Sequence, residues 1–369
     1  MAFHPGRFFR SFAAAAIFVP IAFLSPALAA DLAIYIDKQE DSLNVRAVSV
    51  FDTSAFTIDS QTGMVQKMER IYDLIERRPE AAGTLDQVGD FMDKQYRTVR
   101  ALIPFLKEEK EKQDTDAPSA ELETLNRLLA EAGGLLFDPI EPLVASASGI
   151  EFVVTEDCFF YPFDALHVSG TSLFLKKPVA YRLSQKNTTT PQASASWRGL
   201  IISDADEDPE KGVATVASSF PGAFGFDVQS VRREDIQGIS SVDFILVSAD
   251  GGVNGFKMKH LELRPEMLSR LQPELVYFDC NRYGLNLNFI NHFDQSGVST
   301  YVAPIFSRQK GDASAQTMIR FFRALLNGER PSQAMSLARK TLYDFYVLAG
   351  EDELTAMRSA FPFRVYRLN

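Results

Sequence analysis

The sequence predicts an α/β protein with a mostly parallel sheet, helices on both faces, and a preceding region of strands and helices. Short apolar runs such as Leu200–Ile202, Phe244–Val247 and Leu275–Phe278 have the length and composition of strands buried on both faces. Segments in which apolar residues recur at helical spacing lie between these runs. Apolar residues make up 46% of the chain, enough to build a sizeable core.

The first residues have the features of a secretory signal peptide. Arg7 and Arg10 precede an apolar run from Phe12 to Leu24, and Ala27–Ala29 is a small-residue cleavage pattern. A single membrane anchor is the alternative, but the run is shorter than the ~20 residues of a spanning helix. We therefore expect residues 1–29 to be a signal peptide, and the mature protein to be periplasmic or secreted without a membrane span.

Residues 30–149 are predicted to form the N-terminal region of strands and helices. Alternating apolar residues between Leu32 and Ile58 predict a half-buried hairpin. The period then changes, and Met64–Arg77 has the spacing of an amphipathic helix. Further helices are expected at Val88–Lys112, at Ala120–Phe137 and from Asp138 to Val144, with a charged loop over Glu108–Ser119.

Residues 150–369 are predicted to form the main α/β domain. A polar segment at Gln185–Ser196 is interpreted as an exposed loop. Strands are expected at Glu151–Val154, Leu173–Leu175, Ala180–Leu183, Gly199–Ile202, Val242–Ser248, Leu275–Phe278, Val298–Ile305 and Phe363–Arg367, and helices at Val213–Ser219, Arg232–Gln237, Ala313–Leu326 and Pro331–Leu348.

Charge and motifs argue against several classes of function. The net charge of −10 disfavours nucleic acid as a partner, because phosphates are bound by clustered lysine and arginine. His167, His260 and His292 show no metal-ligand spacing, and no phosphate-binding glycine motif is present. We therefore expect no metal and no cofactor. The two cysteines, Cys158 and Cys280, could form a disulfide or remain as buried thiols.

Two predicted strand ends carry residues capable of chemistry. Ligands and catalytic groups gather at the carboxyl ends of parallel strands. One such end is Val247–Gly252, and the other is Val276–Asn281.

The chain resembles the CHAT domain family, a branch of the caspase-like cysteine peptidases. Phe152–Cys158 followed by Tyr161–Leu166 is similar to a hairpin of that family, and Leu136–Leu143 resembles the helix before it. Ala217–Gly222 resembles a helix end of the family, and Gly297–Ile305 resembles one of its strands. The resemblance extends over nearly all of the mature chain, including the N-terminal strands and, from Ile319 to Ala338, the last long helix pair.

The resemblance implies a caspase-like fold with a catalytic cysteine and histidine. The nucleophile position falls on Cys280, whereas Asp250 occupies the place of the histidine before Gly251. The backbone of Gly251 and Cys280 would form the oxyanion hole. A neighbouring carboxylate disfavours the thiolate that an imidazolium would stabilise, and Asp279 is expected to add to this effect.

Three functional hypotheses follow. The first is an exported, non-catalytic pseudopeptidase that binds a peptide or protein partner. The second is an active caspase-like cysteine endopeptidase that uses Cys280 with another base, such as His167, His260 or His292. The third is a structural module whose groove is closed.

Overall fold

A computed structural model describes residues 32–76, 120–183, 193–194, 196–208, 210–306 and 312–368. The predicted signal peptide, the predicted helix Val88–Lys112 and most of the predicted loops Glu108–Ser119 and Gln185–Ser196 lie outside these residues. No helix in the described ranges is both long enough and apolar enough to span a bilayer.

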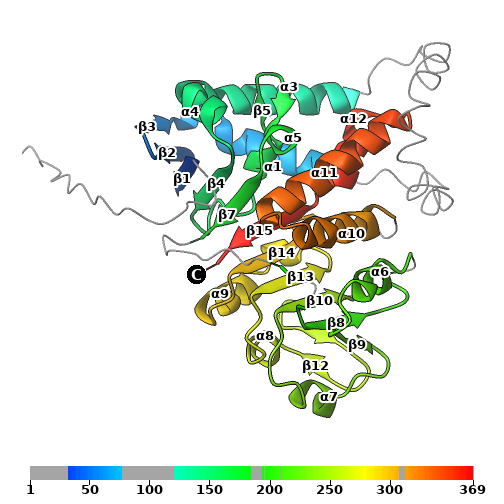
Figure 1. Ribbon diagram of the computed structural model, residues 1–369. Coiled ribbons are helices and arrows are strands. Elements are labelled where there is room, and N and C mark those ends of the chain that lie inside the picture. Colours follow the sequence, from blue (N-terminus) through cyan, green and yellow to red (C-terminus); the bar gives the residue numbers. More distant parts are fainter. Residues whose placement is uncertain are drawn as a thin grey trace, which may run out of the picture.

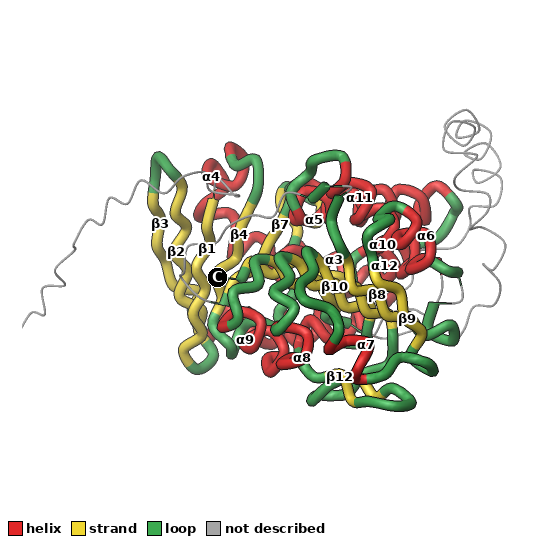
Figure 2. The backbone as a smooth tube through the Cα atoms, turned by 60° about the horizontal axis from the view of Figure 1, so that its bottom comes forward, coloured by secondary structure: helices red, strands yellow, loops and turns green. Residues whose placement is uncertain are grey.

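An eleven-stranded, mostly parallel sheet forms the centre of the molecule (Figures 1 and 2). The predicted α/β class is therefore confirmed. The strand order is β3-β2-β1-β4-β7-β15-β14-β13-β10-β8-β9. The strands are β1 (Leu32–Gln39), β2 (Ser42–Ser49), β3 (Thr53–Ile58), β4 (Ile150–Val154), β7 (Val179–Arg182), β8 (Gly199–Ser203), β9 (Phe224–Asp227), β10 (Phe244–Ser248), β13 (Leu275–Asp279), β14 (Thr300–Pro304) and β15 (Phe363–Arg367).

The sheet contains two groups of parallel strands that run in opposite directions, β1-β4-β7-β15 and β14-β13-β10-β8-β9, and β2 and β3 extend the first group as antiparallel strands. β15 pairs antiparallel with β14 but parallel with β7. The carboxyl ends of β10 and β13 therefore lie on one side of the sheet, and the carboxyl ends of β4 and β7 lie on the opposite side. Because β1 pairs with β4 over five residues, the N-terminal strands extend the same sheet as the main domain.

Helices cover both faces, as predicted. Over β10 and β13, one face packs against α6 (Gly212–Ser218) and α10 (Asp312–Leu326). The other face packs against α8 (Pro265–Ser269) and α9 (Leu287–Gln295). The remaining helices are α1 (Met64–Glu76), α3 (Ala120–Phe137), α4 (Glu141–Ser146), α5 (Leu173–Lys176), α7 (Arg233–Gln237), α11 (Pro331–Leu348) and α12 (Glu353–Ala360), with short 3-10 turns η1 (Ser60–Thr62), η2 (Asp138–Ile140), η3 (Phe163–Ala165) and η4 (Tyr283–Leu285).

Two local predictions were wrong. Leu173–Leu175 was expected to be a strand but begins α5, a single helical turn in which Leu173 and Phe174 are buried. A short apolar run fits a buried helix as well as a strand, so its period is not informative. Phe152–Leu166 was expected to form a hairpin. Instead, β4 pairs in parallel with β1 and β7, and the chain continues through turns into η3.

Other elements had not been predicted. Short two-residue strands form the pairs β5 (His167–Val168) with β6 (Thr171–Ser172) and β11 (Phe256–Lys257) with β12 (Glu262–Leu263). The strand β9 and the helices α8, α9 and α12 were also missed. These elements have four to nine residues, too few to show a clear period.

Helix α3 packs closely on the backbone of β5 through Gly133. A Cβ atom at Gly133 would lie 2.1 Å from the carbonyl oxygen of His167. We expect Gly133→Ala to lower the free energy of unfolding by about 1–3 kcal/mol, as overpacking does. Gly134→Ala is the matched control, because its nearest contact would be the flexible Asp138 carboxylate at 3.3 Å. The control should be neutral or stabilising by up to about 1 kcal/mol. Urea unfolding of both variants measures the difference, and equal effects would contradict the close packing.

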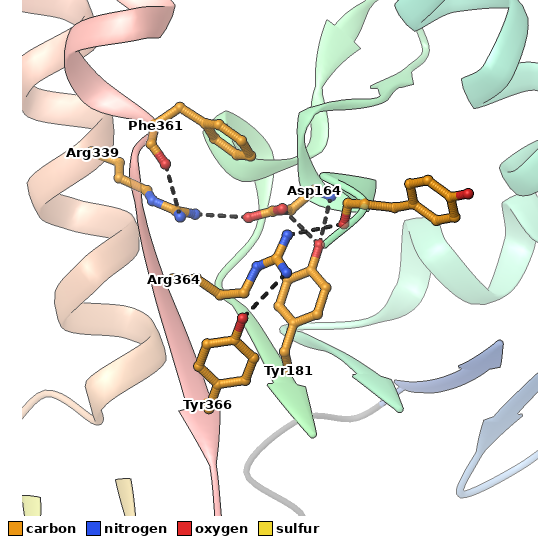
Figure 3. Close-up of polar contacts among 7 residues, drawn as sticks. Asp164, Tyr181, Arg339, Phe361, Arg364 and Tyr366 are labelled. Atoms are coloured by element: carbon orange, nitrogen blue, oxygen red, sulfur yellow. Dashed lines mark hydrogen bonds and ion pairs between the residues drawn. The ribbon is translucent and has the colours of Figure 1, made fainter. Parts of the chain in front are cut away.

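A buried polar network joins β7, β15, α11, η3 and the residues just before η3 (Figure 3). The Asp164 carboxylate accepts hydrogen bonds from Arg339 at 2.8 Å and from the Tyr181 hydroxyl at 2.7 Å. Arg364 stacks on the Tyr181 ring, 3.7 Å from its centroid, and donates to the carbonyl of Tyr161 at 2.9 Å. Burial lowers the pKa of Arg339, and the charge of Asp164 opposes this shift. The network therefore links segments that are distant in sequence.

Candidate functional site

The two strand ends singled out in the sequence lie side by side. β10 and β13 are parallel neighbours, and Ser248 pairs with Asp279 at their carboxyl ends. The loops that follow, residues 249–253 and 280–284, are called here the strand-tip loops. Tertiary structure thus brings together Asp250, Gly251 and Cys280, the residues that the family resemblance had indicated.

The thiol of Cys280 is buried in the core. Its side chain is 1% exposed and belongs to the same apolar cluster as Val276 and Phe278. Side chains alternate between the faces of a strand, so Cys280 continues the row of Val276 and Phe278 that packs against α8 and α9. The next residue, Asn281, is exposed, as is Asp250 on the neighbouring loop. The Asn281 amide and the Asp250 carboxylate therefore face solvent, whereas the Cys280 sulfur is buried.

Asp279 lies on the face opposite to Cys280. Its carboxylate is buried and accepts hydrogen bonds from Ser248 Oγ at 2.8 Å and from Ser314 Oγ at 2.5 Å. Ser314 belongs to the first turn of α10, where helix N–H groups favour a negative charge. The expectation that Asp279 acts directly on the thiol is therefore not supported by its orientation. The hydrogen bonds of Asp279 instead connect α10 to the ends of β10 and β13.

Tyr283 fills the space between the strand-tip loops. Its hydroxyl donates to the carbonyl of Gly252 at 2.8 Å, and the residue is 3% exposed. A Cβ atom at Gly251 would lie 2.4 Å from the Tyr283 hydroxyl oxygen, so only glycine fits there. Burial raises the pKa of Tyr283, and the nearby Cys280 and Asp250 raise it further. The sequence analysis did not single out Tyr283. The adjacent Gly251 and Gly252 were the available signal, because glycine often marks a place where another group approaches the backbone closely.

The Tyr283 ring packs against a cluster of three phenylalanine rings. The ring centroids of Phe256, Phe289 and Phe278 lie 4.6, 5.0 and 5.7 Å from that of Tyr283. Such pairs contribute about 0.5–1.5 kcal/mol each beyond the area that they bury. Tyr283 is therefore a fixed part of the core.

The rest of the second strand-tip loop is held in place by side chains from elsewhere in the fold. Arg282 has a positive φ of 56° and donates from Nε and Nη2 to Glu76 of α1, at 3.0 and 2.5 Å. The Tyr301 hydroxyl donates to the Tyr283 carbonyl at 2.7 Å, and the Tyr366 hydroxyl donates to the Gly284 carbonyl at 2.5 Å. Tyr366 also contacts Arg364, which connects the loop to the buried network of Figure 3.

The predicted oxyanion hole is altered at Gly251. Its N–H group donates to the carboxylate of its own neighbour, Asp250, at 3.1 Å. An oxyanion hole stabilises negative charge with donors aimed at empty space for substrate. Here the donor already faces a carboxylate, and a second negative charge at that place would be repelled.

The three histidines of the described chain lie on other elements. His292 is in α9 and shares a 2.8 Å hydrogen bond between its Nε2 and Ser269 Oγ of α8. His260 is exposed in the turn between β11 and β12. His167 lies in β5, beside α3, and burial lowers its pKa. These positions give no support to a histidine acting as the base for Cys280.

Both cysteines carry buried thiols and are not joined by a disulfide. Burial raises the pKa of Cys158 to about 11. Within the described ranges, no three His, Cys, Asp or Glu side chains gather closely enough to hold a metal ion.

Comparison with known proteins gives only distant similarity. No protein-family model matches the chain, and no curated protein matches it. One similar solved structure is the complex of the pro- and mature domains of Porphyromonas gingivalis RgpB, at 9% identity and a TM-score of 0.42 over 82% of this chain and 76% of that one. Another is the Arg-specific cysteine proteinase gingipain R (RgpB), at 8% identity and a TM-score of 0.42 over 84% and 75%. A TM-score of 0.42 is too low for either neighbour to assign a fold family or an activity to this chain.

Proposed function

We propose that this protein is an exported, non-catalytic member of the caspase-like cysteine peptidases, related to the CHAT family, that binds a peptide or protein partner. The observation that carries the proposal is the burial of Cys280 at the end of β13, with Asp250 at the position of the base. A thiol acts as a nucleophile only as an accessible thiolate. The signal-peptide pattern of residues 1–29 supports export.

The contacts of Gly251 also favour a non-catalytic role. A peptidase needs room for a scissile peptide between its nucleophile and its oxyanion donors. Tyr283 occupies the space beside Gly251, and Asp250 accepts the hydrogen bond of the Gly251 N–H. Each of these contacts also restricts the motion of the loops. The loops therefore keep their arrangement although the site has no catalytic activity.

The proposed partner binds the exposed surface of the strand-tip loops. The loops expose Asp250, Asn281 and Arg282, and also Val253, whose side chain is 73% exposed. An exposed apolar side chain among polar ones can contribute to a protein-binding surface. The partner therefore contacts the loops from outside, without entering a peptidase groove.

Peptide hydrolysis tests the proposal. The purified protein and its Cys280→Ala variant should both leave a peptide library uncleaved above the uncatalysed background, because the thiol has no access to substrate. Mass spectrometry of the library measures this. Cleavage by the wild type that disappears in Cys280→Ala would show an active cysteine endopeptidase instead. Binding is measured separately on peptide arrays, where Val253→Asp should weaken the signal and Leu337→Asp, at an exposed leucine of α11, should not.

A further inference from the structure

The strand β3 forms the outer edge of the sheet. Within the described chain it is hydrogen-bonded to β2 alone, and Figure 2 shows it at the end of the sheet beyond β2. Its sequence, Thr53 to Ile58, contains no charged residue and no proline. Lysine, inward charges and proline are the usual means by which proteins block an exposed edge. Among the described residues, nothing blocks the β3 edge from pairing with another strand.

The hairpin register shows which backbone groups face outward. The N–H of Ser49 donates to the carbonyl of Asp52 at 2.9 Å, so these two residues form a hydrogen-bonded pair. In an antiparallel ladder, hydrogen-bonded and non-hydrogen-bonded pairs alternate. Even-numbered residues of β3 therefore face β2, where Val45 pairs with Phe56. The N–H and C=O groups of Ala55 and Thr57 face away from the sheet, as does the C=O of Thr53. The Thr53 N–H donates to the Asp52 carboxylate at 2.7 Å.

These outward groups are self-complementary. When two copies of β3 pair antiparallel about a two-fold axis at Ala55, Thr53 of each copy lies opposite Thr57 of the other. The two Ala55 residues then exchange both of their backbone hydrogen bonds, and the N–H of each Thr57 donates to the Thr53 carbonyl of the other copy. The Thr53 N–H keeps its bond to Asp52 of its own subunit. A shift of the register by two residues leaves one outward residue of each copy without a pair. Ala55 also has the smallest side chain in the strand, which allows two copies to meet at the axis.

Charge and exposure agree with this register. Asp52 lies opposite Ile58 of the second copy, so no acidic residue faces another acidic residue across the pair. Asp59 lies opposite Phe51 of the second copy in the same register. Phe51 is 97% exposed at the hairpin tip, beside Val50 at 67%. Pairing brings this apolar tip next to the start of η1 in the second copy and removes part of it from water.

We propose that the protein forms a two-fold dimer by antiparallel pairing of β3 with β3 of a second copy, centred on Ala55. The dimer extends the sheet across both subunits. It leaves the strand-tip loops of each subunit uninvolved, so dimer formation does not depend on whether Cys280 has any activity.

Sedimentation velocity over a range of concentrations tests the dimer. The wild type should sediment as a dimer, and Ala55→Pro as a monomer, because proline removes the outward N–H of residue 55 from both copies. Proline keeps the bonds to β2, since that N–H does not face β2. The unfolding midpoint of Ala55→Pro measures whether the subunit fold is intact. A monomeric wild type at all concentrations overturns the proposal, and so does an Ala55→Pro dimer as tight as that of the wild type.

Charge substitutions test the position of the two-fold axis. Ala55→Lys and Ala55→Glu each place like charges face to face, and each should raise the dimer dissociation constant by up to roughly fivefold. An equimolar mixture of the two variants should dimerise again, because lysine then faces glutamate. Thr53→Lys combined with Thr57→Glu is the matched control, since its opposite charges face each other across the axis and the dimer should persist. A mixture of the residue-55 variants that stays monomeric would contradict the register.

Discussion

Replacing Arg339 with methionine should lower the free energy of unfolding by about 3–5 kcal/mol, the cost of leaving a buried charge without its partner. Arg339 and Asp164 are both almost fully buried, and the pair is 2.8 Å apart. Methionine fills a similar volume, so the loss reports mainly on the buried Asp164 charge left without its partner and much less on a cavity. Urea unfolding followed by circular dichroism measures the change, provided that the slope with denaturant stays constant.

Lys340→Met is the control for this prediction, on the same helix and with the same new side chain. Lys340 pairs with Asp344 at 2.9 Å, but both side chains are about half exposed. Exposed pairs contribute at most about 1 kcal/mol. Equal destabilisation by the two variants would show that the buried pair has no special role. Asp164→Asn together with Arg339→Met should recover part of the loss, because no uncompensated charge then remains.

Removing the Tyr283 side chain should have a comparably large effect and should change the reactivity of Cys280. Tyr283→Ala removes a buried aromatic ring and should cost about 3–5 kcal/mol. It also opens the space between the strand-tip loops, near Cys280. We therefore expect a thiol reagent at neutral pH to label Cys280 before Cys158, whose pKa is raised to about 11. In the wild type both thiols are buried, and both should react slowly.

Tyr283→Phe separates the ring from the hydroxyl. It keeps the contacts with Phe256 and Phe289 and removes the hydrogen bond to the Gly252 carbonyl, which is worth about 1 kcal/mol. Its Cys280 should label as slowly as that of the wild type. Rapid labelling of Cys280 in the unmodified protein would mean that the thiol is accessible, and would count against the non-catalytic proposal.

The long elements of the fold were predictable because their residues repeat with a clear period. Ala120–Phe137 and Pro331–Leu348 were predicted with the bounds that the structure shows. The apolar runs of β10 and β13 were recognised because both faces of these strands are buried. Leu173–Leu175 failed because three residues cannot distinguish the two periods. The signal peptide and the helix Val88–Lys112 stay predictions, since they lie outside the described residues.

The candidate site was predictable in position but not in orientation. The ends of β10 and β13 were expected to carry the chemistry, and they do lie together. Sequence could not show that Cys280 points inward and Asn281 outward, because a shift of one residue in the strand boundary exchanges the two faces. Nor could it place Tyr283 over Gly251, a contact between residues 32 positions apart.

The sequence by itself determined the class of the fold, its long elements and the pair of strand ends, because local periodicity and side-chain chemistry suffice for these. Tertiary structure decided that the two groups of parallel strands run in opposite directions, that β3 is left as an edge, and that the thiol is covered. These features depend on contacts between distant segments, such as β15 with β7 and Tyr283 with Gly251. No local pattern specifies such contacts, because they arise only when the whole core packs.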